Sequence, residues 1–309
     1  MDNLCWVRIV NASWKNDIMG KALFPCLLPL FAFITAACGV IPPAPILVTP
    51  TPAISPVPTA AALSASIELN PNEWMSWPEI PAVTENMREI YALGQSLGNN
   101  PNAFSIFGDC QSEPDVFLGP YVTDPAQFAS LPSNLQQTTE YFKDSLNRVS
   151  PTSKNGTTSG ALIWNAWHEN KLGCRPDESP MNCELRLHKP SFVFIMVGTH
   201  SEGGRNMLYL RKVLDTLLAQ GVVPILSTKA DNREGDHQVN LETAQLAAEY
   251  SVPLWNFWPV VDNLPNRGLY TKEIDRNLGD IYLTEEALAL HRLSAIKVLD
   301  SIRKVVTGD

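Results

Sequence analysis

The stretch Ser191-Phe-Val-Phe-Ile-Met-Val197 is a continuous apolar run that ends directly at Gly198-Thr199. Continuous rather than alternating hydrophobicity is typical of a strand that is buried on both faces of a parallel sheet. Three further short apolar runs, at residues 103–107, 222–226 and 253–258, share this character. Together the four runs predict four strands of one sheet.

Amphipathic segments lie between these runs. We expect helices over residues 85–97, with Thr84 as the N-cap, and over 206–219, 241–250 and 283–306. Strands that alternate with helices predict βαβ units. The expected fold class is therefore α/β, a doubly wound, flavodoxin-like parallel sheet with helices on both faces. In such a three-layer α/β/α domain the ligand site lies off the carboxyl ends of the strands.

The N-terminal region has the pattern of an export signal. Residues 22–37 are nearly all apolar, follow Lys21 and end in small residues before Cys38. This pattern is typical of a secretory signal peptide, because a spanning helix needs about 20 apolar residues and different flanks. The ending Ile34-Thr-Ala-Ala-Cys38 resembles the bacterial lipobox, which implies that Cys38 is the lipidation site. We expect a leader over residues 1–37, with its true start at Met19, and a lipid anchor on the extracytoplasmic face of a bacterial membrane.

The next segment is rich in proline, with seven prolines between residues 42 and 58. Proline fixes φ and removes a backbone donor, so this composition favours an extended tether over a packed element. We expect a tether over residues 38–65 and one folded domain over 66–309. The chain has 32 acidic and 23 basic residues, a formal charge of -9, and no basic run. That balance argues against nucleic acid as a partner and against electrostatic docking on anionic lipid.

Three cysteines remain beyond Cys38 in the expected mature chain. Cys174 and Cys183 bracket a polar, proline-containing loop, and outside the cytoplasm we expect a local disulfide between them. Cys110 is then left without a partner. An odd thiol in an exported protein is either buried and inert or reactive.

Four short motifs occur in the order and strand context of the conserved blocks of the SGNH (GDSL-like) hydrolases, which the region of about residues 100 to 300 resembles. The four motifs are Phe107-Gly108-Asp109-Cys110-Gln111-Ser112, Asn155-Gly-Thr-Thr-Ser-Gly160, Val197-Gly198-Thr199-His200 and Gly279-Asp280-Ile281-Tyr282-Leu283-Thr284. The resemblance implies an SGNH-hydrolase-like fold and a site built from Cys110, Gly160, His200 and Tyr282, with Asp280 as an orienting carboxylate.

Three of the four defining positions differ from the family pattern. Cys110 stands at the place of the nucleophilic serine, His200 at that of the asparagine and Tyr282 at that of the histidine base, while Gly160 matches. A tyrosine, with an ordinary pKa of about 10, is a poor general base at neutral pH. Whether the chain is an enzyme is therefore open.

Three interpretations remain. In the first, Cys110 is the nucleophile of an ester hydrolase that acts on an acetylated glycan or lipid, with His200 as base or oxyanion donor. In the second, catalysis is lost and the cleft binds a carbohydrate or cell-envelope ligand through aromatic side chains. The third is a structural envelope lipoprotein. The aromatic candidates for the second interpretation are Trp164, Trp167, Trp255 and Trp258.

The remaining polar candidates have simpler explanations. We expect Asp109 to be a helix N-cap, His291 to be a packed or solvated residue of the last helix, and Lys229 and Asp231 to follow a strand end, where they either line the cleft or are ordinary loop residues. The other histidines lack the spacing of metal ligands, so we expect no metal and no other cofactor. We expect the protein to be a monomer. The expected partner is a small-molecule or glycan ester as substrate.

Overall fold

The computed structural model describes residues 69–200, 205–276 and 279–308, which belong to one compact unit, Ala62–Asp309. The expected leader, the lipidation site Cys38 and the whole of the tether lie outside the described residues, so these expectations stay predictions.

The core element is a four-stranded parallel sheet in the order β1-β2-β3-β4. Its strands are β1 (Asn100–Gly108), β2 (Pro190–Met196), β3 (Val223–Ser227) and β4 (Leu254–Trp255). Nearly every residue of β2 and every residue of β3 is buried, as continuous apolar runs predict. All four strands that the sequence predicts are thus present, although β4 is shorter than expected.

A fifth segment lies on the other side of β1. Ser153 forms an isolated parallel bridge with Gly108, and the Gly108 N–H donates to the Thr152 carbonyl oxygen at 2.9 Å. The chain then crosses from this bridge, past β1, to β2. The winding direction therefore reverses at β1, which confirms the doubly wound arrangement and places the expected site beside the end of β1.

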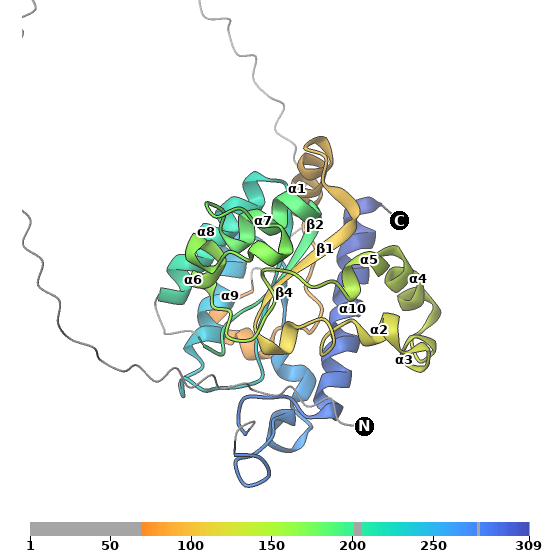
Figure 1. Ribbon diagram of the computed structural model, residues 1–309. Helices are drawn as coiled ribbons and strands as arrows, with labels where there is room; N and C mark the ends of the chain where they lie inside the picture. The colour runs from red at the N-terminus through yellow and green to blue at the C-terminus, as the bar shows by residue number, and fades with distance from the viewer. Residues whose placement is uncertain (1–68, 201–204, 277–278, 309) are drawn as a thin grey trace, which may run out of the picture. The chain divides into compact units, whose positions relative to one another are not determined.

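Helices cover both faces of the sheet (Figure 1). On one side lie α6 (Ser159–Ile163), α7 (Pro180–His188), α8 (Arg205–Ala219) and α9 (Gln238–Tyr250), and on the other α4 (Ser133–Tyr141), α5 (Lys143–Leu146) and the long α10 (Glu285–Thr307). The remaining helices are α1 (Glu85–Ser96), α2 (Pro120–Thr123) and α3 (Pro125–Ala129). The expected three-layer α/β/α architecture is confirmed. Among the described helices, none combines the length and the apolar character that crossing a membrane requires.

The helix ends show what sequence patterns can and cannot specify. Thr284 caps α10 through its side chain, which accepts a hydrogen bond from the Ala287 N–H. Thr84 occupies the N-cap position of α1 as predicted, but its hydroxyl makes no capping bond. The helices between β1 and β2 were not predicted, because they are only four to nine residues long and carry too few turns for a clear hydrophobic period.

Aromatic rings fill much of the core beside the sheet. Phe194 on β2 contacts Phe104, Phe117 and Trp255 edge to face, with ring centroids 5.7 to 6.0 Å apart. Edge-to-face pairs of this kind stabilise a core by about 0.5–1.5 kcal/mol beyond the area they bury. They connect β1, β2 and β4, so the rings hold these strands together.

The Cys174–Cys183 disulfide closes a short loop before and inside α7, at a sequence separation of 9. This confirms the pairing predicted from the sequence. Cys110 is the free cysteine among the described residues, and it is buried.

We predict that replacing both Cys174 and Cys183 by alanine lowers the free energy of unfolding by about 2–3 kcal/mol, because the open loop gains conformational entropy in the unfolded chain. Urea unfolding followed by circular dichroism measures the change. The reduced wild-type protein should match the double variant, and equal stability of the oxidised wild type and the variant would contradict the prediction.

Candidate functional site

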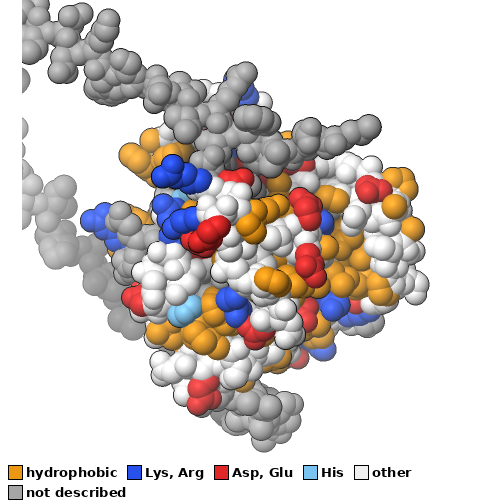
Figure 2. Space-filling model, turned by 90° about the horizontal axis from the view of Figure 1, so that it is seen from below, with side chains coloured by type: hydrophobic (Ala, Val, Ile, Leu, Met, Phe, Trp, Pro, Cys, Tyr) orange, Lys and Arg blue, Asp and Glu red, His pale blue; other side chains and the backbone are white. Residues whose placement is uncertain are grey.

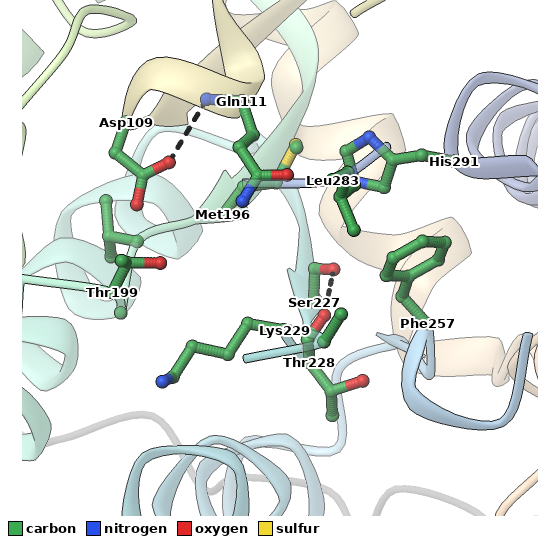
Figure 3. Close-up of a pocket in the computed structure, with 13 residues that line it drawn as sticks. Asp109, Gln111, Met196, Thr199, Ser227, Thr228, Lys229, Phe257, Leu283 and His291 are labelled. Carbon is green, nitrogen blue, oxygen red and sulfur yellow. Dashed lines mark hydrogen bonds between the residues drawn. The ribbon is translucent and has the colours of Figure 1, made fainter. Parts of the chain in front are cut away.

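A small hollow lies at the carboxyl ends of β1, β2 and β3, where the winding of the chain predicts a ligand site (Figure 3). Its volume is about 40 Å³, room for roughly one water molecule. Asp109 and Thr199 lie on one side of it and His291 and Phe257 on the other, with Gln111 between them.

Asp109 is the first residue after β1, and its carboxylate lines the hollow. Its Oδ1 accepts a hydrogen bond from the Gln111 N–H at 3.3 Å, which caps the short 3-10 helix Cys110–Ser112. The expected N-cap role is therefore confirmed. The side chain is nevertheless almost wholly buried, with the residue only 4% exposed. A buried carboxylate at a strand end is unusual for a simple cap and needs electrostatic compensation.

Burial raises the pKa of Asp109 to about 7, because water no longer solvates the charged form. The bond from the Gln111 N–H opposes this shift, and the nearby Asp231 carboxylate adds to it. Thr199 and Lys229 also lower the pKa, but by less than burial raises it. Asp109 is thus poised to take up or release a proton near neutral pH.

A second buried carboxylate lies close by on the loop after β3. Asp231 is 1% exposed, and its Oδ2 accepts a hydrogen bond from the Thr199 hydroxyl at 2.8 Å. The Lys229 ammonium group lies 2.6 Å from Asp231 Oδ1 and 2.6 Å from Glu234 Oε2. Thr199 also lowers the pKa of Asp109, so its side chain acts on both acids. The Lys229 ammonium group thus compensates the negative charge of this cluster, whose residues come from the loops after β1, β2 and β3.

Cys110 lies next to this cluster but does not line the hollow. It is 2% exposed, and its Sγ lies 4.0 Å from Asp109 Oδ1, within the range of a weak S–H···O hydrogen bond. The position expected for the nucleophile is therefore in contact with the carboxylate whose pKa is raised.

His200 and Gly160 lie outside the lining of the hollow. His200 is half-buried, and its Nδ1 lies 3.2 Å from Arg233 Nη1. Burial and the Arg233 charge lower the pKa of His200, so the ring is neutral at neutral pH. Gly160 is part of α6, where a Cβ would come within 3.1 Å of the Tyr209 ring. The close packing of α6 on α8 therefore accounts for this glycine in structural terms.

Tyr282 and Asp280 lie on the segment before α10. The Tyr282 carbonyl oxygen accepts a hydrogen bond from the Tyr270 N–H at 3.0 Å, and the next residue, Leu283, reaches the hollow. Asp280 forms an exposed ion pair with Lys272 at 3.2 Å and lines a different pocket. Of the five residues expected in the site, Cys110 contacts a residue that lines the hollow, through the approach of its Sγ to Asp109 Oδ1. The roles of the other four stay predictions.

His291 lines the hollow from α10 and is packed rather than solvated. Its ring lies between Phe117, Trp255 and Phe257, with centroid distances of 5.0, 4.9 and 4.6 Å. Complete burial lowers the pKa of His291 to about 3, and the Arg292 charge adds to the effect. The ring is neutral at neutral pH, and its apolar surroundings make it a poor proton carrier.

The aromatic candidates for sugar stacking divide into two pairs. Trp255 is fully buried and Trp258 is 8% exposed, so both belong to the core. Trp164 and Trp167 are 60% and 42% exposed, and neither lines the hollow. In the part of the chain that the structure describes, no three His, Cys, Asp or Glu side chains are grouped to hold a metal ion.

Sequence reasoning did not identify the connection between Asp109, Thr199 and Asp231. Thr199 falls inside a motif that drew attention to its neighbour His200, and Lys229 and Asp231 looked equally consistent with an ordinary polar loop. The signal that could have found them is positional. All three follow buried strands, and the carboxyl ends of parallel strands meet at one edge of a sheet.

Comparisons with known proteins give likeness in the fold. No protein-family model matches the chain, and no curated protein matches it either. A solved G-D-S-L family protein, described as lipolytic, from Desulfitobacterium hafniense matches 64% of this chain and 99% of its own, at 17% identity and a TM-score of 0.41. A GDSL-like lipase from Bacteroides thetaiotaomicron matches 70% of this chain and 98% of its own, at 14% identity and a TM-score of 0.41. At these values the likeness does not identify any catalytic side chain.

We predict that Asp109→Asn stabilises the protein at pH 8 and has little effect at pH 4. The folded pKa of about 7 lies above the ordinary aspartate pKa of 3.8, so the folded state retains a proton that the unfolded state loses. The resulting stability is fully present below pH 4 and is lost as the pH rises to about 7. Asparagine can keep the capping bond but carries no charge.

The expected gain at pH 8 is on the order of 2–4 kcal/mol in the free energy of unfolding. Urea unfolding of both proteins between pH 4 and pH 9 measures it. A difference that does not change with pH would show that Asp109 has an ordinary pKa.

Proposed function

We propose that this chain is an ester hydrolase in which Cys110 is the nucleophile and Asp109 is the group that accepts its proton. The observation that carries the proposal is the 4.0 Å contact between Cys110 Sγ and Asp109 Oδ1 at the edge of the hollow. The proposed substrate is an acyl ester such as an acetylated glycan or lipid. The likeness to lipolytic proteins agrees with this chemistry but does not carry it.

The pKa of Asp109 suits the task of a general base. A catalytic base works best when its pKa is close to the working pH, and Asp109 has a pKa of about 7. An ordinary thiol has a pKa of about 8.5, so moving its proton to Asp109 costs roughly 2 kcal/mol. A tyrosine base at position 282 is not needed in this scheme.

The reaction then runs in two halves. Asp109 takes the Cys110 thiol proton, the thiolate attacks the ester carbonyl carbon, and the bond to the alcohol oxygen breaks as that oxygen takes the proton from Asp109. Water then attacks the thioester and gives a proton to Asp109. The C–S bond breaks, the free acid leaves, and the thiolate takes the proton back.

Two polar groups in the wall of the hollow can stabilise the negative charge on the carbonyl oxygen. They are the Lys229 ammonium group and the Gln111 amide, whose nitrogen also donates to the Ile281 carbonyl oxygen at 2.8 Å. Because Cys110 is 2% exposed and the hollow has a volume of only about 40 Å³, the loops around it must move apart to admit an ester. Slow turnover follows from that step.

We predict that hydrolysis of p-nitrophenyl acetate is lost in Cys110→Ala and falls by about 10²-fold or more in Asp109→Asn, because the nucleophile or its base is missing. A spectrophotometric assay gives the rates, and mass spectrometry of a quenched reaction maps the acetyl group to Cys110. Lys212→Ala, on the exposed side of α8, is the control and should keep the wild-type rate.

Equal rates in the wild type and Cys110→Ala would contradict the proposal. Absence of both hydrolysis and an acetyl adduct on Cys110 would favour the alternative of a protein with this fold that binds a carbohydrate or cell-envelope ligand without turnover.

A further inference from the structure

A second, larger pocket adjoins the hollow through their shared residue Ala230. It has a volume of about 740 Å³ and lies between the loop after β3 and the segment that leads from β4 to α10. That segment is drawn in blue below the strands in Figure 1. The proposed hydrolysis makes no use of this pocket.

The charged side chains that line this pocket are mainly cationic. Arg233, Arg267 and Lys272 line it, against one carboxylate, Asp280. The chain as a whole carries a formal charge of -9, so a cationic lining runs against the overall balance. On the side seen in Figure 2, from below the strands, Lys and Arg side chains gather mainly on one half, with acidic side chains among them. A cationic concavity on an acidic protein attracts anions.

The Arg233 charge is not neutralised by a carboxylate of the described residues. Its guanidinium Nη1 lies 3.2 Å from Nδ1 of the His200 ring, and no described acidic side chain forms an ion pair with it. The lowered pKa of His200 keeps the ring neutral, so it can accept a hydrogen bond from Arg233 without neutralising the guanidinium charge. Arg233 therefore presents guanidinium N–H groups at the pocket, and these groups can donate hydrogen bonds to an oxyanion.

Arg267 is fixed in place on the opposite wall. Its guanidinium carbon lies 3.4 Å from the centroid of the Trp258 ring, and it pairs with Asp262 and donates to the Trp258 carbonyl oxygen. Its buried Nε has no hydrogen-bond partner. His237, at the end of the loop after β3, meets the Trp258 ring edge to face at 4.8 Å and keeps a buried Nδ1 without a partner.

Backbone strain is concentrated at the same pocket. Among the described residues other than glycine, six have positive φ, and four of them line it: His237, Asn266, Arg267 and Asp280. Their φ angles are 58°, 46°, 53° and 64°. This conformation costs about 1–2 kcal/mol for most L residues and less for Asn and Asp, and strain of this kind clusters at ligand sites. The strained backbone therefore places cationic and polar side chains in the lining of this one pocket.

We infer that this second pocket binds an oxyanion, a carboxylate or phosphate group, through Arg233 and Arg267. The substrate class of the neighbouring hollow would then be an ester that carries a negative charge several bonds from its acyl group, such as an acidic glycan. The link to the substrate rests on the proposed hydrolysis, whereas anion binding by the pocket does not.

The test is a titration of the full chain by isothermal titration calorimetry with glucuronate, with inorganic phosphate and with neutral glucose. We expect one of the two anions to bind, more weakly at higher salt, and glucose not to bind. Arg233→Ala should weaken anion binding by about tenfold, the worth of one charge-assisted hydrogen bond, and Arg233→Lys should recover part of it. Arg175→Ala, an exposed arginine on the disulfide loop, is the matched control and should bind as the wild type does.

Tighter binding of glucuronate than of phosphate identifies a carboxylate ligand, and the reverse identifies a phosphate ligand. Binding of neither anion, or equal binding in Arg233→Ala and Arg175→Ala, would overturn the inference. Anion binding in a protein that hydrolyses no ester would leave the pocket assigned and reject the proposed hydrolysis, so the two failures can be told apart.

Discussion

The burial of the Asp109 carboxylate at the end of β1 is the constraint on which the site depends. A carboxylate that loses its water is costly unless it is protonated or compensated by polar partners. Here the Gln111 N–H, the Thr199 side chain and the Lys229 charge compensate it in part, and its pKa still rises to about 7. The loops after β1, β2 and β3 therefore have to stay together, because each supplies one partner of this cluster.

The fold produces that constraint. Reversal of the winding at β1 leaves a depression beside its carboxyl end, and the parallel register brings the following loops to the same edge. The aromatic contacts of Phe117 and Trp255 with His291 close the other side of the depression. A hollow with one ionisable wall and one apolar wall results, and Cys110 lies against the ionisable wall.

Much of the fold could be predicted from the sequence, because buried parallel strands leave continuous apolar runs. The runs at β1, β2 and β3 and the Cys174–Cys183 pair carry such local signals. For the site, the sequence allowed a prediction of its location at the strand ends but not of its contacts. The contact between Thr199 and Asp231 joins residues 32 positions apart, and the burial of Asp109 depends on packing that no local pattern encodes. Gly160 shows the opposite case. It belongs to a motif that the sequence predicted to be part of the site, but the packing of α6 against Tyr209 explains it.

The most direct measurement is a carbon-13 NMR titration of the aspartate carboxyl groups, with Asp109→Asn used to assign the Asp109 signal. A titration midpoint near pH 7 for Asp109 would support the account, because a buried carboxylate in contact with Cys110 is its central feature. A midpoint near the ordinary aspartate pKa of 3.8 would contradict it, since Asp109 would then be an ordinary solvated cap.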